Sequence, residues 1–241
     1  MTRPRFLVNA DALAGAQVIL TGAELHHLRV RRLHVGSELT VADGQGQEHQ
    51  GFVEALDRHR AIIRLAGVGP SRDSPLRLVL AQALLKSGKL DLVVEKTTEL
   101  GVSDIILFTC ERSVSHVSVE RQSRWARIAR SAAKQSQRST VPTIACPISF
   151  EDVMSRRQEA VGLFLWEEAP SANLKTVSVR PGSSVIVVVG PEGGFSAAEA
   201  ERAARAGFHW VGLGARVLRA ETAAIVAVTV CQLLWGDLAA C

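Results

Sequence analysis

The chain is poor in cysteine, and its cysteines are not arranged to bind a metal. None forms a Cys-x-x-Cys pair, and no histidine and cysteine cluster has the spacing of zinc ligands. We therefore expect no metal site and only reduced thiols, as in a cytoplasmic protein. The four are Cys110, Cys146, Cys231 and Cys241.

Long hydrophobic runs and targeting signals are absent as well. No apolar segment follows the basic residues at the start of the sequence, so we expect no signal peptide. The most apolar stretch, residues 222–235, is too short to span a bilayer and contains Gln232. It is typical of a buried helix, and we expect no membrane partner. There is no internal repeat and no low-complexity tract.

The charge balance excludes little by itself. The 241 residues include 28 Lys+Arg and 24 Asp+Glu, a formal net charge of +4. This basic excess is mild, so an argument for a nucleic-acid partner depends on where the charge lies.

Residues 1–70 are predicted to form a small β-barrel domain. Short apolar runs at residues 17–20, 38–42, 48–56 and 61–65 are separated by turn signals, and residues 43–46 are a good hairpin turn. Strands at this spacing are typical of a small barrel. A segment rich in glycine, proline and serine follows at residues 67–75 and indicates a linker.

Residues 76–241 are predicted to form an α/β domain. Apolar runs typical of buried strands lie at 76–85, 104–109, 161–166, 184–189 and 209–213. Helical periods or caps lie at 89–100, at 121–138, after Ser149, from Ser196 to Gly207, and at 220–238. Strands alternating with helices predict a mostly parallel sheet covered on both faces.

The predicted helix near residue 130 carries basic residues along one face. On an α-helix they fall within about 120° of arc, opposite Trp125 and Ile128. A solvated helix face is the plain alternative, but such faces usually mix charges of both signs. A stripe of one sign favours contact with phosphates, and a second basic group precedes residue 35, so we expect a structured polyanion such as RNA. The residues are Arg124, Arg127, Arg130, Lys134 and Arg138 in the helix, and Arg29, Arg31 and Arg32 in the first domain.

Two glycine-containing loops each follow a strand-like run near the C-terminus. The first is residues 190–196, which lack both the Gly-Lys-Ser/Thr ending of a phosphate-binding loop and the Gly-x-Gly-x-x-Gly pattern of dinucleotide sites. The second, residues 214–223, places Arg216, Arg219 and Glu221 where the chain leaves a buried strand. Charges in such a place are usually paired or functional. Loops at the carboxyl ends of parallel strands commonly hold ligands.

These loops resemble those of the RsmE family of SPOUT (α/β-knot) methyltransferases. The resemblance lies in Gly190-Pro191-Glu192-Gly193-Gly194-Phe195-Ser196 and in Leu213-Gly214 followed by Val217-Leu218-Arg219-Ala220-Glu221-Thr222-Ala223. It extends upstream to Lys86, Arg112, Arg124-Trp125 and His26-His27-Leu28, and so covers nearly the whole chain. Val217 stands where isoleucine is usual, and Arg31 where leucine is expected.

The resemblance implies a fold and a function. It implies a PUA-like N-terminal domain, and a C-terminal SPOUT domain with a trefoil knot that binds S-adenosyl-L-methionine. It also implies a homodimer that methylates uracil N3 in 16S rRNA of the small ribosomal subunit. The cofactor-binding residues would be Leu165, Trp166, Glu167, Gly190, Pro191, Glu192, Gly193, Gly194, Leu213, Gly214, Val217, Leu218 and Thr222.

The same resemblance yields candidate catalytic residues. Uracil N3 carries a proton, so its methylation requires that proton to leave or the anion to be stabilised. Arg219 is the candidate cation, and Glu192 or Glu221 the candidate base. Both glutamates have an alternative role, in which they hold loop N–H groups or pair with Arg219. Lys86 and Arg112 join the basic stripe as candidate RNA contacts.

The sequence is also compatible with other functions. One is a SPOUT methyltransferase that modifies a ribose 2′-hydroxyl or a tRNA base. Another is a non-catalytic RNA-binding protein of ribosome assembly. A dehydrogenase or a nucleotide triphosphatase is disfavoured, because both phosphate-binding patterns are missing.

Overall fold

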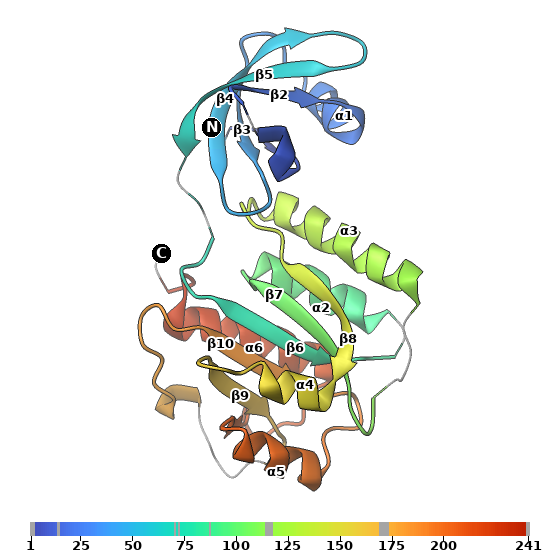
Figure 1. Ribbon diagram of the computed structural model, residues 1–241, viewed down its shortest axis with the longest axis vertical. Helices are drawn as coiled ribbons and strands as arrows, with labels where there is room; N and C mark the ends of the chain where they lie inside the picture. The colour runs from blue at the N-terminus through green and yellow to red at the C-terminus, as the bar shows by residue number, and fades with distance from the viewer. Residues whose placement is uncertain are drawn as a thin grey trace. The chain divides into compact units, whose positions relative to one another are not determined.

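The computed structural model of the chain contains two β-sheets (Figure 1). It describes residues 3–13, 15–69, 71, 73–86, 88–113, 118–168 and 174–239. Its contacts divide the chain into two units. One comprises Met1–Asp73 and Ala133–Val141, and the other Ser74–Ala132 and Pro142–Cys241.

The N-terminal unit is built on a five-stranded half-barrel. Its strands run in the order β1-β3-β4-β5-β2, with β1 parallel to β3 and the other neighbours antiparallel. The predicted turn between β3 and β4 is confirmed: the Asp43 carboxylate accepts the backbone N–H groups of Gln45 and Gln47 at 2.7 and 3.0 Å. The strands are β1 (Arg5–Leu7), β2 (Gln17–Leu20), β3 (Glu38–Ala42), β4 (Glu48–Leu56) and β5 (Ala61–Gly69).

This unit also contains a helix that the sequence pattern did not reveal. Helix α1 (Gly22–Val30) lies between β2 and β3, and a short 3-10 turn (Ala10–Leu13) precedes β2. Leu25 and Leu28 are buried in the core of the sheet. Only these two side chains of the helix are buried, so its apolar period was too short to separate it from the surrounding strands.

A segment from later in the chain belongs to the N-terminal unit. Helix α3 (Val119–Gln135) ends as Gln137 takes a φ of 61°, so Arg138 lies outside the helix. The predicted basic stripe is therefore wrong at Arg138, which is buried and donates to Asp73 at 2.8 Å. Beside it, the buried Arg5 guanidinium bonds to Glu48, and to the Ser139 hydroxyl at 3.0 Å.

The second unit is built on a six-stranded sheet in which every neighbouring pair is parallel. The order β11-β9-β10-β6-β7-β8 places β10, whose five residues are all buried, between β9 and β6. This agrees with the predicted parallel sheet. The strands are β6 (Leu78–Ala83), β7 (Asp104–Thr109), β8 (Thr143–Ser149), β9 (Val161–Leu165), β10 (Val185–Val189) and β11 (His209–Val211).

Helices cover both faces of this sheet, as predicted (Figure 1). Helix α6 (Ala220–Trp235) packs on β6 and β10 and against α2 (Lys89–Glu99). Helix α4 (Phe150–Ser155) packs on β7 and β8, and α5 (Ala197–Arg205) packs on β11. No helix in the described residues is both long enough and apolar enough to cross a membrane.

The predicted helix boundaries in this unit are largely confirmed. Both expected capping boxes form, with Ser149 and Asp152 opening α4, and Ser196 and Glu199 opening α5. Gly101 and Gly207 follow α2 and α5 with φ angles of 87° and 82°, a conformation that favours glycine.

Strand β8 was missed, and the last strand is shorter than expected. β8 contains a proline and lies at the edge of the sheet, where a missing N–H is tolerated but the apolar pattern is weak. β11 ends at Val211, which leaves residues 212–219 as a loop before α6. The carboxyl ends of β9, β10 and β11 consequently face the same edge of the sheet.

Candidate functional site

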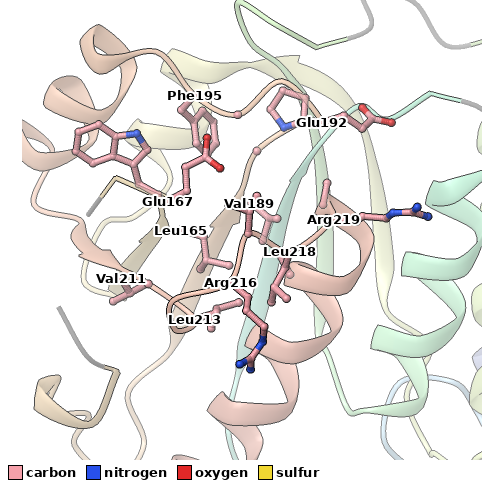
Figure 2. Close-up of a pocket in the computed structure, with 18 of the residues that line it drawn as sticks. Leu165, Glu167, Val189, Glu192, Phe195, Val211, Leu213, Arg216, Leu218 and Arg219 are labelled. Carbon is pink, nitrogen blue, oxygen red and sulfur yellow. The ribbon is translucent and has the colours of Figure 1, made fainter. Parts of the chain in front are cut away.

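A cavity of about 400 Å³ lies at the carboxyl edge of the parallel sheet. Its walls come from the ends of β9, β10 and β11, the loops after them, and the start of α6. Figure 2 shows Leu165, Val189 and Leu218 near the middle of this pocket, with charged side chains around them. The loops after β9, β10 and β11, which hold the predicted cofactor residues, thus line one cavity.

Most of the predicted cofactor residues line this cavity. Gly193 and Thr222 are not among its lining residues. Nine other lining residues were not among the predicted cofactor residues, although Phe195, Arg216, Ala220 and Ala223 lie in the two glycine loops singled out from the sequence. The predicted residues that line it are Leu165, Trp166, Glu167, Gly190, Pro191, Glu192, Gly194, Leu213, Gly214, Val217 and Leu218. The missed ones are Lys89, Val189, Phe195, Val211, Gly212, Ala215, Arg216, Ala220 and Ala223.

The first glycine loop is packed tightly against an aromatic side chain. A Cβ at Gly190 would lie 2.9 Å from the Phe195 ring, which itself packs at a tilt against Phe164 with a centroid separation of 4.2 Å. Phe195 also packs near Phe108 and Phe150, so its ring has little freedom to move. Glycine is therefore required at position 190 by close approach.

A buried amide holds the end of β10 where this loop begins. Gln82, the second-last residue of β6, is fully buried, and its Nε2 donates to the carbonyl oxygens of Val189 and Gly190 at 3.4 and 3.2 Å. Buried carbonyl groups without a donor are costly, so this amide stabilises the loop in one position. A lone glutamine in an apolar strand is the sequence signal that could have revealed it.

Two further side chains tie the loop to the segment after β7. The Arg112 guanidinium donates to the Gly193 carbonyl at 3.0 Å. Glu199, which caps α5 with one carboxylate oxygen, accepts the Glu111 N–H with the other at 2.9 Å. Arg112 was predicted as an RNA contact, but its guanidinium already makes this hydrogen bond to the loop.

The second loop carries exposed arginines at the pocket. Gly214 takes a φ of 102°, which other residues adopt only under strain. Arg216 and Arg219 are exposed, line the cavity, and point in different directions in Figure 2. No ion pair of either guanidinium is found among the described residues. Arg219 immediately precedes α6, so its charge lies close to the pocket and the helix N-terminus.

The carboxylate of Glu192 is held by two donors. It accepts the Lys86 backbone N–H at 3.1 Å and the Lys89 ammonium at 3.0 Å. Burial raises the pKa of Glu192, but hydrogen bonds from its own N–H, from Lys89 and from Lys86 outweigh it, so the pKa lies below its usual value. A carboxylate so stabilised is a weaker base.

Glu221 is in a different environment. It is buried at the first turn of α6, does not line the cavity, and lies with its Oε2 3.7 Å from the Lys89 ammonium. That oxygen has no hydrogen-bond donor among the described residues. The three candidate catalytic residues therefore differ: Arg219 and Glu192 line the pocket, whereas Glu221 does not line it and contacts Lys89.

Several of the predicted RNA contacts already bind protein groups. Arg124 pairs with Asp91 at 2.6 Å. In the N-terminal unit, Lys134 pairs with Glu24 at 2.9 Å, and Arg29 donates to the carbonyl groups of residues 57 and 58. Arg31 bonds to the His27 ring, whereas Arg32, Lys86 and Arg127 have exposed side chains and Arg130 is half-buried. The described residues contain no group of three or more side chains suited to a metal ion.

Comparisons with known proteins point to one family. Residues 72–232 match the family model of an RNA methyltransferase domain, and residues 20–66 match that of an RNA methyltransferase PUA domain. The ribosomal RNA small subunit methyltransferase E of Bacillus subtilis is 32% identical over 235 residues, which cover 90% of this chain and 92% of the relative. The protein of that name from Mycobacterium bovis is 34% identical, with coverage of 92% and 88%.

A solved structure is similar over nearly the full length. The ribosomal RNA small subunit methyltransferase E of Neisseria gonorrhoeae, crystallised with S-adenosyl methionine, has a TM-score of 0.88 and 32% identity. The match covers 98% of this chain and 100% of that one.

The close approach at Gly190 leads to a stability prediction. Gly190→Ala should lower the free energy of unfolding by about 1–3 kcal/mol, because the new methyl group collides with a ring that cannot move away. Gly212→Ala is the matched control: it lines the same cavity, has open space at its Cβ, and should change stability by less than about 1 kcal/mol. Urea denaturation of the whole chain measures both; equal losses would contradict this account of the loop.

Proposed function

This chain belongs to the ribosomal RNA small subunit methyltransferase E family, and we propose that it methylates N3 of a uridine in 16S rRNA. The observation that carries the proposal is the single cavity formed by three loops at the carboxyl edge of the sheet. Two of these loops, within residues 190–196 and 213–223, carry the residues through which the chain resembles this family. The substrate would be the small ribosomal subunit or its rRNA, in the cytoplasm.

The cavity suits S-adenosylmethionine. Its volume lies within the range of small-molecule sites, about 300–1,000 Å³. Leu165, Leu213 and Leu218 offer an apolar surface for a flat base, and the bare backbone at Gly212 and Gly214 leaves open space in the cavity lining. The charged groups of the rim would hold the polar end of the ligand. When bound, S-adenosylmethionine supplies an electrophilic methyl group.

Charged residues in and next to the cavity would assist removal of the uracil N3 proton. Arg219 would stabilise the negative charge that develops on the uracil oxygens as the N3 proton leaves. Glu221 lies outside the cavity lining but is kept as the candidate to accept that proton, because one of its oxygens has no hydrogen-bond donor among the described residues. Glu192, by contrast, already accepts two hydrogen bonds and has a lowered pKa. Glu192 would instead hold the loop, the alternative considered for it from the sequence.

RNA would bind along the basic surface of each unit. In the second unit, Arg127 and Lys86 have exposed side chains and are the first candidates to contact phosphates, and Arg112, Arg124 and Arg130 are further candidates. In the N-terminal unit, Arg32 is exposed, and Arg29, Arg31 and Lys134 would add to the positive field. Arg138 is left out, because it is buried against Asp73.

The protein would act as a homodimer. Helix α6 buries one face on the sheet, but its other face is also apolar, with exposed Leu233 and Leu234. Half-buried Ile225, Val226 and Val230 continue that face. A monomer rarely leaves such a stripe in water, so a second copy of the chain is its proposed partner.

The activity is tested with labelled S-adenosylmethionine and small subunits that lack the modification. Methylation at N3 blocks base pairing, so a new stop of reverse transcription should locate the modified uridine in 16S rRNA. Arg219→Ala should lower the methylation rate by about 100-fold or more with cofactor affinity unchanged, because it removes a charge needed in the transition state. Label elsewhere with no stop in 16S rRNA would overturn the proposed target, and a full rate for Arg219→Ala would overturn its role.

The RNA interface is tested by its dependence on salt. Arg127→Ala should flatten the slope of log K against log salt by about 0.7–0.9, because each phosphate that an arginine neutralises contributes that much to the slope. Arg205→Ala is the control, since Arg205 is an exposed arginine of α5 that pairs with Glu201. A slope unchanged by Arg127→Ala and equal to that of the control would remove α3 from the RNA-binding surface.

The dimer is tested by sedimentation velocity. The unmodified chain should sediment as a dimer, and Leu233→Glu should yield monomers, because a carboxylate would enter the apolar contact. Leu233 is 51% exposed, so the monomer fold should tolerate the change. Ile19→Glu, at a 54% exposed position of β2, is the control. A dimeric Leu233→Glu protein would exclude this face of α6 as the interface.

A further inference from the structure

Lys89 lies between two carboxylates that come from the two glycine-loop segments. Its ammonium is 3.0 Å from Glu192, in the loop after β10, and 3.7 Å from Glu221, in the first turn of α6. Its side chain is one-third exposed and lines the cavity. From the sequence, Lys89 was only the first residue of a predicted helix and had no assigned role.

The position of Lys89 follows from its place on α2. It is the first residue of that helix, after Gly88 with a φ of 66°, and α2 packs against α6. The lysine therefore projects from a packed helix towards the two segments. In the described structure, the Glu192 and Glu221 side chains do not bond to each other, and both contact Lys89. A single cation can join them only from such a position.

Charge balance makes this lysine important. Without it, two carboxylates would face the same partly buried region with no shared counter-charge. Like charges in such a place repel each other and disfavour ionisation. The Glu221 Oε2 has no hydrogen-bond donor of its own, and within the described part of the chain the Lys89 ammonium is the cation that pairs with it.

We infer that Lys89 is a positioning residue that joins the two cofactor loops, by holding Glu192 with one contact and Glu221 with the other. It acts through these carboxylates rather than on the substrate. The inference rests on the proposed function, because the ligand whose binding reports it is S-adenosylmethionine. These two contacts would restrain the pocket rim, to which both glycine loops contribute.

The role has a consequence for pH. Donors including Lys89 keep the pKa of Glu192 below its usual value, against the opposing effect of burial. When the lysine is removed, that pKa must rise, so Glu192 takes up a proton at a higher pH than before. Cofactor binding by the variant should then weaken as the pH falls into the acidic range in which glutamates ordinarily take up a proton, whereas binding by the unmodified chain should persist to lower pH.

Calorimetry with S-adenosylmethionine tests the inference. Lys89→Met keeps the length of the side chain and removes its charge, and should weaken binding by about tenfold at about pH 7.5. Lys89→Arg should bind within about threefold of the unmodified chain, because it keeps a cation at the same place. Arg205→Met, which removes an exposed cation paired on α5, should bind normally at every pH.

A double-mutant cycle separates this role from a general loss of stability. In a Glu192→Gln, Glu221→Gln background, adding Lys89→Met should cost less than about twofold, since its two partners are already neutral. Undiminished binding and an unaltered pH profile for Lys89→Met would overturn the inference, and so would a full tenfold loss in that background. If the unmodified chain bound no S-adenosylmethionine at all, the proposed function would fail, and this inference with it.

Discussion

The site depends on the fixed end of β10. This strand lies between β9 and β6 with every residue buried, and the amide of Gln82 binds the carbonyl groups of Val189 and Gly190 at its end. From that point the chain must turn past the Phe195 ring, which only a glycine allows. The glycine loop is thus rigid because of what surrounds it, although its composition is that of a flexible segment.

At the pocket, the exposed positive charge depends on which charged side chains are paired, and not only on how many there are. One lysine and two glutamates, from three segments, pair at one side, and two arginines of the second loop remain exposed at the rim. The same rule applies to the basic helix. From the sequence it carried an uninterrupted cationic stripe, but Arg124 and Lys134 pair with acidic residues of α2 and α1. The positive surface is therefore smaller than the number of basic residues implied.

Much of this architecture was predictable because it is local. Strands such as 38–42 and 104–109, the capping boxes at Ser149 and Ser196, and the stop at Gly207 follow from neighbouring residues alone. The features that were missed depend on distant partners. Lys89, Gln82 and the end of the basic helix before Arg138 acquire their roles from segments tens of residues away, which no periodicity records.

The membership of residues 133–141 in the N-terminal unit has a consequence for how the protein can be divided. Cutting the chain after Asp73 would remove Ser139 from the buried Arg5 and Glu48 pair, and would separate Asp73 from Arg138. The half-barrel is therefore not a module that a fragment of the first 73 residues reproduces. A gene fusion that transplanted only that fragment would carry a half-barrel in which Asp73 lacks its Arg138 partner and the Arg5 and Glu48 pair lacks the Ser139 hydroxyl, so residues 133–141 should be transplanted with it.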